Sequence, residues 1–165
     1  MRLFVAINLS PELKAALADA QNAMHDRGVR GNYTPKENLH LTLAFLGELP
    51  TADPVMDALA EVTFTPFDLS LDGIGCFGDL WWAGIGDSAP LTAVVRRVRR
   101  ALAANGIPYD RKKFSPHITL LRKASRNVGE IRIAPACMTV DTVSLMSSKR
   151  GRNGMIYTEI GAIEA

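Results

Sequence analysis

The sequence of 165 residues predicts an α/β (α+β) protein, residues 1–165 forming a single domain of two pseudo-symmetric lobes. Apolar stretches of strand length alternate with amphipathic helices, and several strands follow one another directly. A helix, a glycine, a polar loop and a strand that bears His-x-Thr occur twice in the same order. We interpret this repeat as a duplication. No linker separates the halves, so we expect the lobes to pack as one unit.

In the first half of the chain, the apolar stretch Arg2–Asn8 predicts a strand. Ser10 and Pro11 then predict a helix, because serine caps a helix and proline fits its first turn. The apolar residues of this helix share one face, and Gly28 is expected to end it. The elements expected next are a strand at Leu39–Leu46, a helix from Asp53, a strand at Phe67–Ile74, a turn at Gly75–Gly78 and a strand at Trp81–Ile85.

In the second half, Pro90 predicts the start of a long helix that turns its leucines and valines inward and ends at Gly106. The outer face of this helix is expected to be basic. It carries Arg96, Arg97, Arg99 and Arg100. Further strands are expected around His117–Leu121, Met138–Ser147 and Met155–Ile163.

The composition excludes several classes of protein. Apolar residues make up 47% and charged residues 22%, which is typical of globular chains and excludes disorder and coiled coils. No apolar run approaches the ~20 residues that cross a bilayer. The N-terminal segment does not resemble a signal peptide, so a cytoplasmic protein is expected. The two cysteines, Cys76 and Cys137, form no metal-binding or disulfide pattern and are expected to be free thiols.

The charge is distributed unevenly along the chain. Residues 1–88 carry 5 basic and 12 acidic side chains, a net −7, whereas residues 89–165 carry 14 basic and 5 acidic ones, a net +9. Such asymmetry points to an anionic partner for the second half, with nucleic acid as the first candidate. A solvated basic helix face explains the same numbers equally well.

The strongest local signal is the repeated His-x-Thr. Side chains along a strand alternate between its two faces, so His40 and Thr42 share one face and the neighbouring leucines the other. His117 and Thr119 behave in the same way. For one motif alone, a core histidine beside a β-forming threonine is the simpler explanation. Two motifs in matching contexts favour two imidazoles that face each other across a cleft.

A facing pair of histidines suits displacement at phosphorus. An imidazole pKa near ~6.5 allows one ring to be neutral and the other protonated close to neutral pH. One ring can take a proton from the attacking oxygen while the other gives a proton to the leaving oxygen. The two threonine hydroxyls can donate hydrogen bonds to the phosphate oxygens between them.

Other kinds of site are less well supported. The chain has no third histidine near the motifs and no Cys/His cluster, so a metal site would have to use a carboxylate. Gly73–Gly78 matches a dinucleotide-binding fingerprint literally, but a strand follows it instead of a helix, which indicates a hairpin turn. His25 is expected to be solvated. The aromatic residues Tyr33, Phe45, Trp81 and Trp82 could stack a base, although core packing is the simpler expectation.

Taken together, these motifs resemble those of a known family. His40-Leu41-Thr42-Leu43 and Ser115-Pro116-His117-Ile118-Thr119-Leu120-Leu121-Arg122 are similar to the paired H-x-T-x signatures of the two-histidine (2H) phosphoesterases. The resemblance is greatest to the RNA 2′,3′-cyclic phosphodiesterases, also called 2′-5′ RNA ligases or LigT-like proteins. It covers nearly the whole chain, including the pattern Leu145-x-x-Ser147 followed by Gly154-x-x-Tyr157.

The resemblance implies a bilobal LigT-like fold, in which each lobe has an antiparallel-rich sheet with flanking helices around a central cleft. It also implies hydrolysis of terminal 2′,3′-cyclic phosphates on RNA, tRNA fragments among them, to 2′-phosphates. No metal or other cofactor is implied, and the reverse 2′-5′ ligation is allowed. The implied roles are general base for His117, general acid for His40, and phosphate binding for Thr42, Thr119 and Arg122.

Arg122 needs a structural condition to take this role. Strict alternation places it on the strand face opposite to His117, so it reaches the cleft only if the strand ends or bulges near Leu121. The basic residues Arg111, Lys112, Lys113 and Lys123 flank the second motif and are candidates to hold an RNA backbone. Two alternatives stay open: a phosphodiesterase for another cyclic nucleotide or a 2′-5′ oligonucleotide, and an RNA-binding module without catalysis. A monomer is expected.

Overall fold

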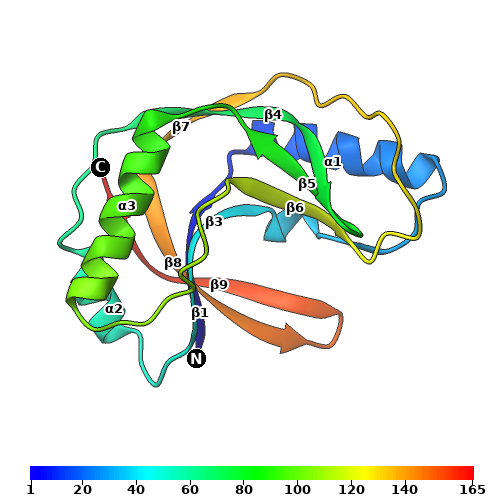
Figure 1. The fold of residues 1–165 in the computed structure, drawn as a ribbon. Coiled ribbons are helices and arrows are strands. Elements are labelled where there is room, and N and C mark those ends of the chain that lie inside the picture. Colours follow the sequence, from blue (N-terminus) through cyan, green and yellow to red (C-terminus); the bar gives the residue numbers. More distant parts are fainter.

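The computed structural model describes residues 1–165, which form nine strands and three α-helices (Figure 1). The helices are α1 (Pro11–Asp26), α2 (Asp53–Leu59) and α3 (Ala89–Ala104). The strands are β1 (Arg2–Asn8), β2 (Asn32–Tyr33), β3 (His40–Glu48), β4 (Phe67–Phe77), β5 (Leu80–Ile85), β6 (His117–Arg122), β7 (Cys137–Val140), β8 (Thr142–Gly151) and β9 (Gly154–Glu164). A short 3-10 helix covers Lys36–Asn38. None of the helices has the length and apolarity needed to span a membrane.

The strands form two antiparallel sheets. The first sheet has four strands in the order β3-β1-β8-β9, and the second has five in the order β2-β6-β5-β4-β7. The sheets approach each other where β3 contacts β6. A single cluster of 37 buried hydrophobic residues includes side chains from both sheets and all three helices. This shared core explains why the sequence has no linker between its halves.

The helices are exchanged between the two sheets. Helix α1 follows β1 of the first sheet but packs against β6 and β7 of the second. Helix α3 follows β5 of the second sheet but packs against β3 of the first, next to α2 (Figure 1). Each sheet also takes strands from both halves of the sequence. The repeat seen in the sequence therefore does not correspond to two consecutive lobes, and the acidic and basic halves of the chain do not separate in space.

The predicted helix starts and apolar faces are confirmed. The Ser10 hydroxyl accepts a hydrogen bond from the Leu13 amide at 3.3 Å, and the Ser88 hydroxyl accepts one from the Leu91 amide at 3.1 Å. Each bond satisfies one of the free amides in the first turn of its helix. The inward-facing residues are buried in both helices: Leu13, Ala16, Leu17, Ala20 and Met24 in α1, and Leu91, Val94, Val95, Val98 and Leu102 in α3.

Two strand predictions are wrong in their boundaries. Strand β4 continues to Phe77, whereas a turn was predicted at Gly75–Gly78. The observed turn consists of Gly78 and Asp79 only. The stretch Met138–Ser147 is not one strand, because it divides at Asp141 into β7 and β8. Strand β7 pairs with β4 in the second sheet, whereas β8 pairs with β1 in the first. The division at Asp141 depends on partners that are distant in the sequence and leaves no local signal. Strand β4 is longer than predicted because it pairs with the adjacent strand β5 as far as Phe77.

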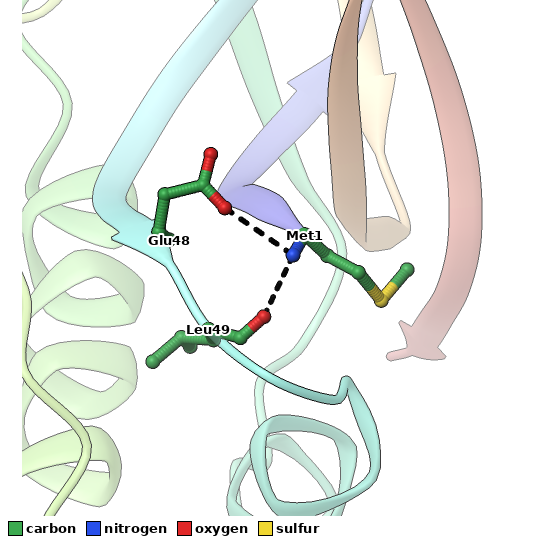
Figure 2. Close-up of polar contacts among 3 residues, drawn as sticks. All are labelled: Met1, Glu48 and Leu49. Carbon is green, nitrogen blue, oxygen red and sulfur yellow. Dashed lines mark hydrogen bonds and ion pairs between the residues drawn. The ribbon is translucent and has the colours of Figure 1, made fainter.

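One end of the first sheet is held by the amino group of Met1 (Figure 2). This group donates a hydrogen bond to the Leu49 carbonyl at 2.8 Å and lies 3.3 Å from the Glu48 carboxylate. The contact joins the start of β1 to the end of β3. It is the only ion pair within 4 Å among residues 1–165.

Candidate active site

A pocket of about 840 Å³ lies between the two sheets and contains both His-x-Thr motifs. His40 and Thr42 reach it from β3, and His117 and Thr119 reach it from β6. The alternate residues Leu41, Leu43, Ile118 and Leu120 are buried in the core. The structure therefore brings the two motifs together in one cavity, as the alternation of side chains predicts.

The two imidazole rings are oriented in the same way. Nδ1 of His40 is 2.7 Å from the Asn38 carbonyl, and Nδ1 of His117 is 2.7 Å from the Ser115 carbonyl. A carbonyl oxygen only accepts hydrogen bonds, so each Nδ1 carries a hydrogen and donates it. This fixes the tautomer and leaves both Nε2 atoms to exchange protons. Nε2 of His40 is 2.9 Å from the Thr42 hydroxyl, which can donate to the neutral ring or accept from the protonated one.

The surroundings of His40 disfavour its charged form. Burial is the main cause that lowers the pKa of His40 below its ordinary value of 6.5. The positive charges of Arg122, His117 and Lys14 lower the pKa further, while the hydrogen bond to the Asn38 carbonyl opposes them. The free protein therefore holds His40 mainly as the neutral ring at neutral pH.

Both motif strands contain a bulge at the fourth residue of the motif. In β3, Thr42 and Ala44 pair with adjacent residues of β1, which leaves Leu43 as the extra residue. In β6, Thr119 and Leu121 pair with adjacent residues of β5, which leaves Leu120 as the extra residue. A bulge shifts the alternation of side chains by one position. Two successive residues are accordingly buried at each bulge.

The bulge in β6 allows the Arg122 side chain to reach the pocket on the same side as His117. Leu120 and Leu121 both face the core, and Arg122 then lines the pocket together with the two histidines. Phe45 occupies the corresponding position in β3, five residues after its histidine, and also lines the pocket. The same backbone device therefore places a cation beside one motif and an aromatic ring beside the other.

Each bulged carbonyl accepts hydrogen bonds from the helix that precedes the other motif. The Gln21 amide of α1 donates to the Leu120 carbonyl at 2.9 Å and to the Thr34 carbonyl at 2.8 Å. The Arg99 guanidinium of α3 donates to the Leu43 carbonyl at 3.2 and 3.3 Å and to the Lys112 carbonyl at 2.7 Å. Gln21 is buried and Arg99 is partly buried. Arg99 thus points inward, contrary to the prediction of a uniformly basic outer face.

Aromatic rings surround both histidines. Phe4 and Tyr157 lie 4.9 and 5.2 Å from the His40 ring. Phe77 and Trp82 lie 5.4 and 6.3 Å from the His117 ring. The sequence pointed to Trp82 only as a general candidate for stacking and missed Phe4 and Phe77.

The other aromatic candidates divide between the core and the pocket. Trp81 is buried, and the Tyr33 hydroxyl donates to the Val29 carbonyl at 2.7 Å, outside the pocket. Phe45 lines the pocket beneath Arg2, whose guanidinium carbon lies 4.8 Å from the ring centre. His25 is exposed and is not part of the pocket.

The basic residues around the pocket differ from those that the sequence suggested. Arg111, Lys112, Lys113 and Lys123 do not line it. Besides Arg122, its cations are Arg2, Lys149 and Arg150. The short basic run Lys149-Arg150 on the hairpin of β8 and β9 was the only local sign of these pocket cations. Nothing in the sequence related this run to the histidines. The structure contains no cluster of three or more residues that could hold a metal ion.

Comparison with known proteins gives relatives along most of the chain. An RNA 2′,3′-cyclic phosphodiesterase of Escherichia coli is 35% identical over 132 residues, covering 77% of this chain and 74% of that protein. A protein of the same name from Thermus thermophilus is 32% identical over 179 residues, covering 96% of this chain and 87% of that protein. A third, from Geobacillus stearothermophilus, is 34% identical over 157 residues, which cover 85% of this chain but only 49% of that protein.

Solved structures show the same fold. Escherichia coli LigT in complex with 3′-AMP superposes with a TM-score of 0.84 at 28% identity, covering 99% of this chain and 97% of that one. The predicted LigT-like fold is thereby confirmed. The family model of the 2′-5′ RNA ligase superfamily matches residues 9–152. The chain belongs to this superfamily, as its paired motifs predicted.

Proposed function

We propose that this chain hydrolyses the terminal 2′,3′-cyclic phosphate of RNA to a 2′-phosphate, with His117 as the general base and His40 as the general acid. The observation that carries the proposal is the pair of imidazoles from different sheets in one pocket, each with Nδ1 held by a backbone carbonyl. The activity is that for which the relatives from Escherichia coli and Thermus thermophilus are named.

The reaction needs one proton to be removed and one to be supplied. Nε2 of neutral His117 takes a proton from water as the water oxygen bonds to phosphorus. The bond from phosphorus to O3′ breaks, and Nε2 of protonated His40 gives its proton to O3′. His117 ends protonated and His40 neutral, and exchange with solvent restores the starting state. A ribose 5′-hydroxyl in the place of water gives 2′-5′ ligation with the same proton transfers.

The phosphate is held from both sheets. The hydroxyls of Thr42 and Thr119 donate to its non-bridging oxygens, and the Arg122 guanidinium neutralises the charge that grows on them in the transition state. These three side chains line the pocket with the histidines. Their donors come from rigid strands, so little reorganisation is needed when charge develops.

The bound phosphate also counteracts the lowering of the pKa of His40. The free protein disfavours the protonated ring that a general acid requires. A phosphodiester carries one negative charge, and a negative charge close to an imidazole favours its protonated form. Substrate binding thereby charges His40 at the moment when its proton is needed.

The finer features of the substrate and setting follow from this proposal. RNA fragments that end in a cyclic phosphate, such as cleaved tRNA, are the substrates. The enzyme uses no metal ion or other cofactor, because the two histidines supply both proton transfers. We further propose that it acts as a monomer in the cytoplasm, as its sequence suggests.

The test is incubation of the purified protein with an oligoribonucleotide that ends in a 2′,3′-cyclic phosphate, in the presence of a chelator. We expect a 2′-phosphate product from the wild type, and strongly reduced product from His40→Ala and His117→Ala. His25→Ala is the matched control, because His25 is the third histidine and lies outside the pocket. A protein that forms no product, or that is equally active after either substitution, would disprove the proposal. The RNA-binding alternative predicts that no product forms and that the protein binds RNA tightly.

A further inference from the structure

The pocket extends well beyond the two histidines. In the pairing of β1 with β3, Asn8 lies opposite His40 and Arg2 lies opposite Glu48. Six residues of strand separate the two pairs, a distance of about 20 Å. Arg2 lines the distant part, and the hairpin residues Lys149 and Arg150 line the same pocket; we call these three residues the basic end. The cavity is therefore longer than a reaction centre alone requires.

The charges of the basic end are available to a ligand. Arg2, Lys149 and Arg150 are exposed, and none of them is in an ion pair with the protein. Glu48, the only carboxylate that lines the pocket, lies 3.3 Å from the amino group of Met1 (Figure 2). Guanidinium and ammonium groups bind phosphate oxygens through charge-assisted hydrogen bonds. An anion with several phosphates matches this arrangement.

The pocket also has an apolar surface. Its apolar lining residues are Phe4, Phe45, Met155 and Tyr157. Aromatic faces stack nucleobases with little regard to sequence. The first sheet thus contributes His40, an aromatic surface and cations to one pocket, a set that matches a phosphate, a nucleoside and further phosphates.

The proposed proton transfers give this arrangement a direction. His40 protonates O3′, so the ribose of the terminal nucleotide lies on the side of the first sheet, which carries His40. The RNA chain continues from the 5′ position of that ribose. The aromatic surface and the basic end also belong to the first sheet, so they lie on the side of the pocket from which the RNA chain would continue.

The hairpin that carries most of the basic end is tied to the motif. Lys149 and Arg150 lie in β8, close to its turn into β9, and this hairpin projects from the body of the protein (Figure 1). The Asn38 side chain donates to the Met155 carbonyl of β9 at 2.9 Å. Asn38 also supplies the carbonyl that orients His40. One residue therefore contacts both the histidine and the hairpin.

We propose that the basic end binds the phosphates on the 5′ side of the terminal nucleotide, so that the enzyme selects RNA chains over cyclic mononucleotides. The proposal rests on the function proposed above and names its substrate class. Its direct consequence is that the preference for longer substrates depends on Lys149 and Arg150.

The experiment compares kcat/KM for adenosine 2′,3′-cyclic monophosphate with that for a trinucleotide that ends in the same cyclic phosphate. We expect the wild type to prefer the trinucleotide. In the variant with Lys149→Ala and Arg150→Ala, the ratio of the two values should fall at least tenfold, since a hydrogen bond between charged groups contributes about 1.5–3 kcal/mol. The dependence of trinucleotide KM on salt should also become weaker.

The matched control removes two positive charges elsewhere. Arg96→Ala with Arg100→Ala changes two exposed residues of α3 that are not part of the pocket, so the ratio should stay at its wild-type value. A ratio that is unchanged in the Lys149 and Arg150 variant, or that falls equally in the control, would overturn the proposal. A loss that is equal for both substrates would do so too, since it would place these cations at the reaction centre.

A second measurement separates this proposal from the proposed function. If the wild type hydrolysed neither substrate, the function would fail. The basic end would then be tested by fluorescence anisotropy with a labelled trinucleotide 3′-phosphate and with adenosine 3′-phosphate as competitor. Binding of the trinucleotide that weakens about tenfold or more in the Lys149 and Arg150 variant supports the basic end, and unchanged binding refutes it.

Discussion

Strands β3 and β6 have nearly the same backbone but different surroundings. Both begin with His-x-Thr, both bulge at the following leucine, and both present the fifth residue after the start of the motif to the pocket. That residue is Phe45 in β3 and Arg122 in β6. The duplicated backbone therefore supplies two similar imidazoles with aromatic rings near both, and the residue after each bulge adds a further aromatic ring in β3 and a cation in β6.

The opposite roles proposed for the two histidines are consistent with this difference. His40 is partly buried, with Phe4 and Tyr157 against its ring, and its pKa is lowered mainly by that burial. A ring of this kind holds a proton only while an anion is present, which suits a group that delivers its proton to the leaving oxygen of a bound phosphate. Under the proposed function, the environment of each histidine, and not the motif itself, would decide its role.

The largest expected effect comes from removal of either histidine. His40→Ala and His117→Ala should each lower kcat by about 10²–10⁴, the usual contribution of a positioned acid or base. The double variant should lose much less than the product of the two single losses, because both rings act in one step. Single-turnover kinetics on a cyclic-phosphate oligonucleotide measure this. Fully multiplicative losses would show that the two rings act independently.

The next effect concerns the bulge in β6. Arg122→Ala should lower kcat/KM about 10- to 100-fold, because a charged contact to the phosphate is lost. Gln21 holds the bulged Leu120 carbonyl, so Gln21→Leu should misplace Arg122 and lower kcat/KM about tenfold or less. In the Arg122→Ala background, Gln21→Leu should have almost no further effect.

This double-mutant cycle distinguishes positioning from general destabilisation. Urea unfolding of all four proteins shows how much stability each substitution removes. An equal loss of kcat/KM from Gln21→Leu in both backgrounds would mean that Gln21 does not act through Arg122.

A smaller effect is expected for the bulge in β3. Arg99→Lys keeps the charge but cannot reproduce the paired hydrogen bonds from one guanidinium to the Leu43 carbonyl. Because Phe45 follows this bulge, KM for the nucleotide should rise several-fold while kcat changes less. Steady-state kinetics measure both values. A change confined to kcat would contradict a role in placing the nucleoside.

The smallest expected effect concerns the pH at which His40 titrates and the change of the free energy of unfolding with pH. By NMR, His40 should titrate below 6.5 in the free protein and at a higher pH when phosphate is bound. Since the pKa is lower in the folded chain, the unfolded chain takes up this proton at a higher pH. The free energy of unfolding should therefore decrease as the pH falls below about 6.5 until the folded-state pKa is passed.

The control for this prediction is the third histidine. His40→Asn should weaken the dependence of stability on pH, whereas His25→Asn changes an exposed side chain and should leave it as it is. Urea midpoints measured between about pH 5 and pH 7 compare the three proteins. A dependence that is the same in all three would exclude His40 as its source.

Local patterns in the sequence were sufficient for the helices and for the chemistry of the motifs. Ser10 with Pro11 marks the start of α1 and Pro90 that of α3, and the alternation around His40 and His117 places both rings opposite a buried face. These features depend on residues only a few positions apart, where spacing alone determines direction.

Features that depend on distant partners could not be predicted. The exchange of α1 and α3 between the sheets, the division of the chain at Asp141 and the inward turn of Arg99 are set by packing between segments far apart in sequence. The basic end was missed for the same reason. Arg2 and Arg150 lie at opposite ends of the chain, and only the pairing of β1 with β8 brings them to one cavity.

The exchange of helices has a consequence for the origin and assembly of the protein. If residues 1–88 and 89–165 are regarded as two copies of one ancestral unit, each copy gives its long helix to its neighbour, as subunits do in a domain-swapped dimer. The exchange goes beyond the helices, because each sheet also takes strands from both halves. Neither half carries the helix that supports its own motif strand. Separately expressed halves should accordingly remain unfolded alone and regain activity only as a noncovalent complex.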